Sequence, residues 1–212
     1  MEEFEELDIA MPDFGELTGN WLSLDFTHTL DERYSAQPEE LLSSYSDLVA
    51  WGIYHQLLTK DEAQHLLHLA KQRPGEAAAA LVRAVDTREA IYRIFYAISE
   101  GEEPPESDVA HLNALLAGAM SHACLVRKDD GYVWDWQKEG ELDVLLWQVV
   151  RSAADLLISD KLDDVRACAA EDCRWLFLDT SKNHSRRWCD MQTCGNQAKA
   201  RRHYSRKKKS QA

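Results

Sequence analysis

The 212-residue sequence predicts a mainly α-helical fold with a small antiparallel β-sheet (α+β), followed by a small cysteine-rich domain. Three observations support this prediction. Apolar residues recur every three or four positions over most of the first 160 residues, two alternating segments flank a short turn, and four of the five cysteines fall within 27 residues. With 45% hydrophobic residues, the composition is that of a globular protein and excludes a disordered or fibrous chain.

The N-terminal part of the chain begins with an acidic stretch (1–16) that has little pattern. Residues 21–29 alternate between apolar and polar side chains, and a period of two is typical of a β-strand. The inward face of this predicted strand carries Leu22, Leu24, Phe26 and His28. A helix is expected from about residue 38 to residue 58, where apolar side chains recur at helical spacing.

Two helices follow in the predicted order. The sequence Thr59-Lys60-Asp61-Glu62 has the pattern of a capping box, which predicts the start of a helix. Pro74-Gly75 predicts its end, because proline does not continue a helix. Residues 76–100 then form the longest predicted helix, with apolar residues at every third or fourth position.

The second half of the body contains two more predicted helices and a hairpin. Ser107 or Asp108 is expected to cap a helix that reaches about residue 121. Residues 124–136 are typical of a β-hairpin, with a strand, a polar turn and an aromatic strand. A clean apolar stripe predicts the last helix of the body over residues 141–158.

The formal net charge of −13 is distributed unevenly along the chain. Residues 1–160 carry −20, whereas residues 161–212 carry +7. This asymmetry indicates an acidic body joined to a segment that binds a polyanion, and a solvated basic tail is the alternative. No apolar run approaches the roughly 18 residues that a membrane span needs, so we expect a cytoplasmic protein that does not bind membranes.

Four cysteines form two pairs with the same spacing, Cys168 with Cys173 and Cys189 with Cys194. Two such pairs supply the thiolates of a tetrahedral zinc site and leave no coordination position open for catalysis. We therefore expect one structural Zn²⁺ per chain. Disulfides are disfavoured because nothing indicates secretion, and redox couples usually have a shorter Cys-x-x-Cys spacing. A secondary role in sensing oxidants through loss of the metal stays open.

The order of elements around the cysteines is also readable. Trp175-Leu176-Phe177-Leu178 follows the first pair and predicts a short strand, and the second pair leads into a basic helix that Asn196 is expected to cap. A tight turn that carries two metal ligands (a knuckle), followed by a hairpin and by a helix that begins at the second ligand pair, is the order of elements in a treble-clef-like zinc finger. We therefore divide the chain into an acidic helical domain (1–163) and a basic four-cysteine zinc-finger domain (164–212).

The run from Cys168 to Tyr204 resembles the CGNR-type zinc finger, notably in Ser185-Arg186-Arg187-Trp188-Cys189 and in Ala198-Lys199-Ala200-Arg201-Arg202-His203-Tyr204. The preceding body resembles the ABATE domain. Its marks here are Leu24-Asp25-Phe26, Tyr45-Ser46-Asp47-Leu48, Arg88-Glu89-Ala90-Ile91-Tyr92 and Arg151-Ser152-Ala153-Ala154-Asp155-Leu156-Leu157. The resemblance covers nearly the whole chain and implies a stress-induced bacterial transcription regulator.

Two positions depart from the family pattern. The Cys-Gly-Asn-Arg that gives the finger its name reads Cys194-Gly195-Asn196-Gln197, so a neutral amide replaces a cation. In the body, His28-Thr29 stands where an Asn-Thr pair usually follows the Leu-Asp-Phe segment. The first change removes one phosphate contact if the family arginine makes it, and the second puts any ligand role of that asparagine in doubt.

The charge pattern predicts that the finger binds DNA, because a basic helix beside further arginines presents several cations to a phosphate backbone. The acidic domain would then sense a small-molecule effector or mediate homodimerisation. The predicted nucleic-acid contacts are Arg186, Arg187, Gln197, Lys199, Arg201, Arg202 and Arg206.

A ligand pocket in the body is a further hypothesis. Arg88 falls on the apolar stripe of the longest predicted helix, and a buried guanidinium needs a carboxylate or a ligand as its partner. Asp25 is the candidate partner, and His28 and Arg33 lie nearby in sequence. An internal Arg–Asp pair without a ligand explains the same pattern, and by general precedent it is the stronger explanation.

Two other functions stay open. A finger that docks an acidic protein surface would need the same cations. Asn183-His184 and His203 resemble the residues of treble-clef nucleases of the His-Asn-His type, but the sequence places no acidic ligand for a second metal. We therefore predict a protein that is not an enzyme.

Overall fold

The computed structural model describes residues 9–15, 19–137 and 140–201. Within these ranges the body consists of α1 (Leu22–Thr27), α2 (Tyr45–Tyr54), α3 (Lys60–Gln72), α4 (Pro74–Ser99), α5 (Glu106–Met120) and α6 (Val144–Leu157). The strands are β1 (Leu30–Asp31), β2 (Glu39–Glu40), β3 (Ala123–Lys128), β4 (Gly131–Trp136), β5 (Val165–Ala167) and β6 (Leu176–Leu178). They pair in chain order as three separate two-stranded antiparallel sheets.

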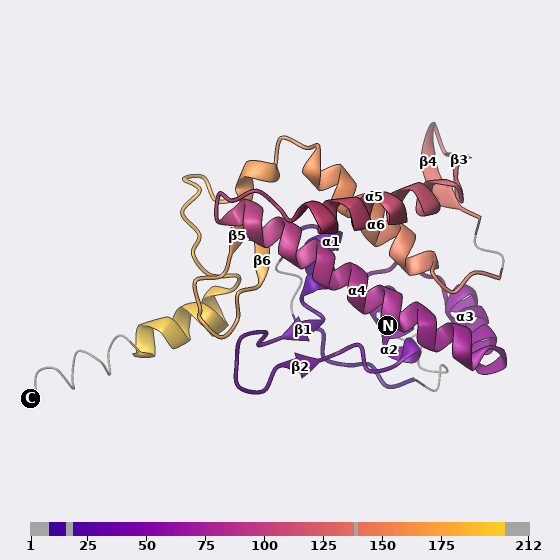
Figure 1. The fold of residues 1–212 in the computed structure, drawn as a ribbon, viewed down its shortest axis with the longest axis horizontal. Helices are drawn as coiled ribbons and strands as arrows, with labels where there is room; N and C mark the ends of the chain where they lie inside the picture. The colour runs from indigo at the N-terminus through magenta and orange to yellow at the C-terminus, as the bar shows by residue number, and fades with distance from the viewer. Residues whose placement is uncertain (1–8, 16–18, 138–139, 202–212) are drawn as a thin grey trace, which may run out of the picture.

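The long helix α4 crosses most of the molecule, and α5 and α6 lie along it (Figure 1). The β3–β4 hairpin projects at one end, and the cysteine-rich segment forms the other end. This segment includes a 3₁₀ turn, η2 (Leu162–Asp164), and a π-helical turn, η3 (Met191–Gly195), which continues as an α-helix over residues 196–201. A membrane span would require a longer and more apolar helix than any in the part of the chain that the structure describes.

The strand predicted over residues 21–29 is wrong, because residues 22–27 form helix α1. All side chains from Ser23 to Thr27 are buried, since α4, α6 and β6 contact this helix from different sides. One polar side chain bonds within the segment: the Thr27 hydroxyl donates to the Leu24 carbonyl oxygen at 2.6 Å. A short helix that is buried all round has no polar face, so its sequence lacks the period that identifies helices.

The helix predicted over 38–58 is shorter than expected. Residues 39 and 40 pair with β1 instead, and α2 begins at Tyr45. Its start is fixed by a capping box in which Ser44 and Asp47 exchange hydrogen bonds with each other's backbone N–H groups. The same device at Thr59 and Glu62 begins α3, which confirms that prediction.

The start of α5 differs from the prediction as well. The helix begins at Glu106 after Pro105, without a side-chain cap, so neither Ser107 nor Asp108 has the expected role. The Asp108 carboxylate instead accepts two hydrogen bonds of 2.7 Å from the Arg93 guanidinium on α4. Helix α4 and the β3–β4 hairpin lie where the sequence predicts them, and α6 is a few residues shorter than its predicted range.

One hydrophobic core extends from the helices into the C-terminal segment. Val165 of β5 and Leu176 and Leu178 of β6 belong to the same buried cluster as the core side chains of α1, α4 and α6. The strands β5 and β6 therefore pack against the helical body directly. The predicted division at residues 163 and 164 stays a prediction, and it separates two parts that share a core.

Arg88 has carboxylate partners other than the predicted one. Arg88 is 1% exposed, and its guanidinium donates two hydrogen bonds of 2.6 and 2.7 Å to Glu40 and a third of 2.9 Å to Glu89. Glu89 also pairs with Arg33. Asp25 takes no part in this network; its carboxylate accepts from the backbone N–H of Gly19 at 2.9 Å. The network links β2 to α4 and leaves the buried cation compensated.

We expect Glu40→Ala to lower the free energy of unfolding by about 2 kcal/mol, because it removes the bidentate partner of a buried guanidinium while Glu89 remains. The matched control is Glu39→Ala, which changes the neighbouring exposed residue of β2 and should cost less than about 0.5 kcal/mol. Urea denaturation of both variants measures the difference. Equal effects would show that the Arg88 pair does not stabilise the fold.

Candidate metal centre and its surroundings

The four paired cysteines converge on one point. Their sulfur atoms all lie within 4.8 Å of one another, and all four residues are buried. The Sγ–Sγ distances are 3.6 Å for Cys173–Cys189 and 3.7 Å for Cys189–Cys194. A disulfide bond is much shorter, at about 2.05 Å. Four sulfurs at about 2.3 Å from a tetrahedral ion are separated by about 3.8 Å, so this set fits one zinc ion.

Two tight turns present the first and second pairs. Cys168 follows β5, and the chain then reverses so that the Cys168 N–H donates to the Trp175 carbonyl oxygen at 2.8 Å. Arg174 adopts a left-handed conformation (φ 56°) directly after Cys173 and closes this turn. In the second pair, Cys189 precedes η3 and Cys194 lies within it, and the Asp190 carboxylate at the start of η3 accepts from the Thr193 N–H at 2.6 Å. Asp190 therefore caps the N-terminal end of η3 and of the helix that continues from it. The prediction that Asn196 caps this helix is wrong.

The cluster needs positive charge. Hydrogen bonds from the neighbouring thiols hold the pKa of Cys168 far below its usual range, whereas the same contacts raise the pKa of Cys173 and Cys189. Four adjacent sulfurs cannot all ionise without a cation among them, and zinc removes this conflict because each ligand is a thiolate. The Trp175 N–H also donates to the Cys173 sulfur at 3.5 Å.

Arg186 belongs to the support of this centre and not to an open surface. Its Nε donates to the Trp188 carbonyl oxygen at 3.0 Å, its Nη2 bonds to the Cys189 carbonyl oxygen, and its guanidinium lies 4.5 Å from the centre of the Phe177 ring. The side chain is half-buried. We conclude that Arg186 braces the second knuckle, which leaves less of its charge for a nucleic-acid contact.

A buried carboxylate that the sequence analysis missed shapes the loop between the cysteine pairs. Asp179 is 0% exposed and accepts hydrogen bonds from the N–H groups of Ser181 and Arg186 at 3.0 and 2.9 Å. Burial alone would raise its pKa, but these hydrogen bonds outweigh burial and lower it. An aspartate that ends a buried strand, with serine two residues later, is the signal that predicts such a turn.

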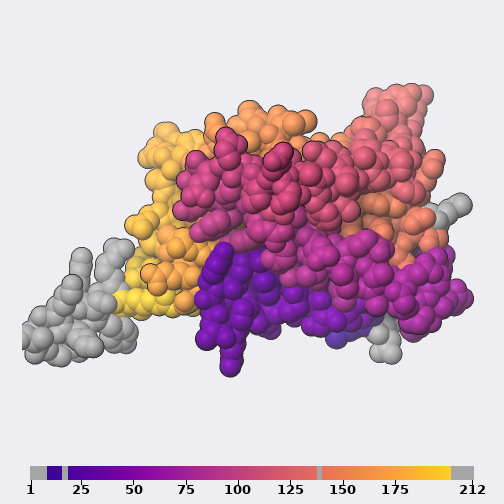
Figure 2. Space-filling view, viewed as in Figure 1, coloured from indigo at the N-terminus to yellow at the C-terminus, as the bar shows by residue number. Residues whose placement is uncertain are grey.

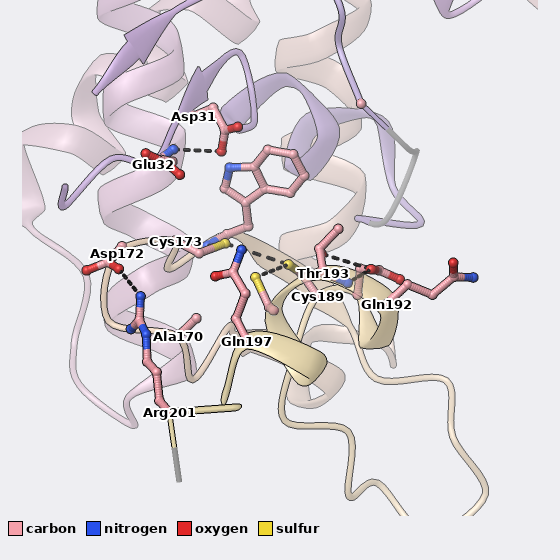
Figure 3. Close-up of a pocket in the computed structure, with 14 residues that line it drawn as sticks. Asp31, Glu32, Ala170, Asp172, Cys173, Cys189, Gln192, Thr193, Gln197 and Arg201 are labelled. Carbon is pink, nitrogen blue, oxygen red and sulfur yellow. Dashed lines mark hydrogen bonds and ion pairs between the residues drawn. The ribbon is translucent and has the colours of Figure 1, made fainter. Parts of the chain in front are cut away.

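The predicted nucleic-acid residues occupy different environments. Arg187, Gln197 and Lys199 are exposed, and the Arg187 guanidinium lies 5.3 Å from the centre of the Trp188 ring. Arg201 is exposed but pairs with Asp172 at 2.6 Å, as Figure 3 shows. The last two predicted contacts, Arg202 and Arg206, lie outside the described residues.

A cleft of about 720 Å³ opens beside the metal centre, between the body and the finger (Figure 3). Asp31 and Glu32 approach it from the body, and Asp172, Gln197 and Arg201 approach it from the finger. The predicted ligand-pocket residues line neither this cleft nor a second, smaller groove near α5 and α6; those residues are Asp25, His28, Arg33 and Arg88. A small-molecule site at these residues stays a prediction.

Asp25 and His28 instead lie at the junction of the body and the finger. The His28 Nε2–H donates to the Leu176 carbonyl oxygen at 2.8 Å, and its ring stacks on Trp175 with 4.1 Å between ring centres. The His28 Nδ1 is 3.7 Å from the Asp25 carboxylate. Burial lowers the pKa of His28 to about 4 and raises the pKa of Asp25 to about 6.

The residues behind the nuclease alternative are only partly described. His184 has a left-handed backbone (φ 46°) and its Nδ1 lies 2.8 Å from the Asp164 carboxylate. His203 lies outside the described residues. Within the part of the chain that the structure describes, the only cluster of potential metal ligands is the four cysteines.

Two family models match the chain. The ABATE model, described as a putative stress-induced transcription regulator, matches residues 20–160, and the CGNR zinc finger matches residues 165–207. A comparison with curated proteins found no match. The four buried cysteines are thus the single zinc site of a CGNR zinc finger. The transcription-regulator description agrees with a role that is not enzymatic.

We expect the purified chain to contain one zinc ion and Cys173→Ser to lose it. Because Leu176 and Leu178 belong to the common core, loss of the metal should lower the free energy of unfolding of the body as well, by several kcal/mol. The matched control is Cys124→Ser, which changes the cysteine outside the cluster. Elemental analysis should find one zinc ion in Cys124→Ser, and this variant should unfold at the same temperature as the wild type. If the melting curve of Cys173→Ser overlays that of the wild type, the prediction of a shared core is contradicted.

The pKa of Asp25 predicts a pH-dependent effect of Asp25→Asn. The folded protein holds the Asp25 proton up to about pH 6, whereas the unfolded chain releases it near 3.8. The stabilisation from this group is therefore lost as pH rises through 6, by up to about 3 kcal/mol. The variant keeps the oxygen that accepts from Gly19, so it should match the wild type near pH 4 and be more stable at pH 7.

Urea denaturation at both pH values tests this prediction. Asp129→Asn, in the exposed turn of the β3–β4 hairpin, is the control and should behave as the wild type at both. A difference between Asp25→Asn and the wild type that is the same at pH 4 and pH 7 would show that burial does not hold the proton on Asp25.

Proposed function

The chain belongs to the ABATE family, and we propose that it regulates transcription by binding duplex DNA through its CGNR zinc finger. The observation that carries the proposal is the exposed basic helix that continues directly from the metal centre. Lys199 and Arg201 lie on this helix, four and six residues after Gly195, where η3 ends. Cations on a helix that a metal site holds in place are the usual means of contacting a phosphate backbone.

The position of this helix supports the proposal. It lies at the extremity of the molecule, at the end opposite the β3–β4 hairpin (Figures 1 and 2). Exposed Arg187, from the loop before the second cysteine pair, adds a further cation to the same small domain. The body carries a net charge of −20 over residues 1–160, so its surface repels phosphate and favours an approach of DNA to the finger.

Several contacts hold the finger against the body. The Tyr34 N–H donates to the Asp172 carbonyl oxygen, and the Tyr92 hydroxyl donates to the Arg174 carbonyl oxygen, both at 3.2 Å. The Leu178 N–H donates to the Gly19 carbonyl oxygen at 3.0 Å.

In the proposed function the body is the sensor or the dimerisation part, and these contacts carry its state to the DNA-binding helix. A regulator of this kind acts in the cytoplasm, where the DNA is.

Gln197 gives this finger a different chemistry from the family pattern. Its side chain is exposed and lines the cleft together with Arg201 (Figure 3). An amide contributes hydrogen bonds but no net charge, so a contact from Gln197 would favour base edges over phosphates. Lys199 and Arg201 would then supply the electrostatic part of the binding.

We expect the protein to bind duplex DNA with a log–log salt dependence of about −4 to −5, as about five cations neutralise phosphates. Lys199→Ala should weaken binding several-fold and reduce the magnitude of the slope by about one. Lys71→Ala, on the exposed side of α3, is the matched control and should leave both values unchanged. Fluorescence anisotropy with labelled duplexes at several salt concentrations measures them.

Two results would contradict the proposal. One is the absence of DNA binding at low salt by the zinc-loaded protein. The other is an equal loss of affinity in Lys199→Ala and Lys71→Ala, which would indicate an attraction that does not involve the finger. Heparin and unlabelled specific DNA can also be compared as competitors for the labelled duplex. If heparin abolishes binding of the labelled duplex and the specific DNA does not, the alternative of an acidic protein partner is favoured.

A further inference from the structure

The β3–β4 hairpin exposes a cluster of large apolar side chains. The exposed fractions are 72% for Tyr132, 60% for Leu125, 42% for Trp134, 41% for Val133 and 36% for Val126. The hairpin stands out from the body at the end away from the finger, as Figure 2 shows. Apolar surface that is concentrated on one projecting element is typical of an interaction site.

The hairpin is firmly attached at its base and open along its edges. Trp136 is buried against Trp147 of α6, and the Arg151 guanidinium lies 4.4 Å from the centre of the Trp134 ring. Among the described residues, β3 and β4 pair only with each other. Their outer edges therefore present backbone N–H and C=O groups to which another strand can bind.

We propose that β3 of one chain pairs with β3 of a second copy of this chain, so that the two hairpins form one four-stranded antiparallel sheet. A two-fold axis relates the copies, and the pairing is centred on Val126. This proposal concerns a surface that the finger does not use, so it is independent of DNA binding. Three features of the hairpin lead to this partner and this register.

The first feature is the direction of the backbone groups. Lys128 pairs with Gly131 across a two-residue turn, and such a closing pair exchanges both of its hydrogen bonds. Lys128 and Val126 therefore turn their backbone groups toward β4, and Leu125 and Arg127 turn theirs outward. Hydrogen bonds to a second copy form only where residues whose backbone groups turn outward lie opposite outward-turned residues of that copy. The two-fold axis must therefore pass beside a residue of β3 and not between two residues.

The second feature is the apolar row that one of these registers creates. With Val126 opposite the second copy's Val126, the cross-strand neighbour Val133 of each chain extends the row on both sides. Four valines then lie side by side on one face of the sheet. Centring the pairing on Arg127 instead would place two like charges opposite each other, which is destabilising.

The third feature is charge. In the register centred on Val126, Lys128 lies opposite the second copy's Cys124, whose cross-strand neighbour is Asp135. Each lysine thus approaches a carboxylate of the other chain, twice per dimer. Centring on Leu125 would move Lys128 opposite His122, beyond the strand. The other edge, β4, carries Asp135 but no cation to match it, so charge complementarity selects β3.

The arrangement would place the two fingers at the far ends of the dimer, since the hairpin and the finger lie at opposite ends of one chain (Figure 1). Each finger would then be available to a separate segment of DNA. A dimer of this form predicts two separated contact regions and not one compact site.

The oligomeric state of the zinc-loaded, full-length protein tests the proposal by sedimentation velocity over a range of concentrations. We expect a monomer–dimer equilibrium whose dissociation constant rises at least about tenfold in Val126→Lys, because the lysine would face its own copy across the axis. Val82→Lys is the matched control: Val82 is 59% exposed on α4 and should leave the constant unchanged. A monomer at every concentration, or an equal effect of both variants, overturns the proposal.

Two further variants test the register even if Val126→Lys weakens the hairpin itself. Lys128→Asp should weaken the dimer, and the double change Lys128→Asp with Asp135→Lys should restore it. In a Cys124→Ser background, Val126→Cys should form a disulfide-linked dimer under mild oxidation, whereas Val82→Cys should not. A dimer that neither variant affects or cross-links uses another surface, and the proposal is then wrong.

Discussion

The chemistry of four buried sulfur atoms determines how the C-terminal part of this protein is built. Thiolates that lie within 4.8 Å of one another repel strongly unless a cation is placed among them. Two side chains hold the cysteine-bearing turns so that these sulfurs meet. Asp179 fixes the loop between the cysteine pairs, and Arg186 bonds to the carbonyl groups of Trp188 and Cys189. Metal binding and folding of this segment are therefore one equilibrium.

The same constraint reaches into the helical body. The strand β6 lies between the two cysteine pairs in sequence, and two of its leucines complete the core that α1, α4 and α6 form. His28 joins the parts a second time, through its stack on Trp175 and its hydrogen bond to Leu176. Burial lowers the pKa of His28 to about 4, so the ring is neutral at neutral pH and the contact between body and finger buries no charge at this position.

The sequence predicted the features that depend on local spacing. The cysteine pairs, the capping box at Thr59 and the hairpin turn are all encoded within a few residues, and the structure has each of them. The segment 21–29 was misread because a helix buried on every side carries no helical period. The partner of Arg88 was misassigned because Glu40 is distant in sequence and sits on a two-residue strand, which no propensity identifies. Asp179 was missed although Ser181, two residues later, is a local signal for a turn, because the burial of the Asp179 carboxylate depends on tertiary packing, which local composition does not determine.

The common core has a consequence for how such a protein can change over evolutionary time. Many zinc fingers are transferable cassettes that recombination moves from one chain to another without loss of folding. In this chain, moving the finger to another protein would remove three buried side chains from contact with the helices: Val165, Leu176 and Leu178. Apolar surface would then be exposed on both the finger and the body. Body and finger are therefore expected to diverge together, and the exposed surface of the finger would change by point substitution, as at Gln197, more readily than by exchange of the whole domain.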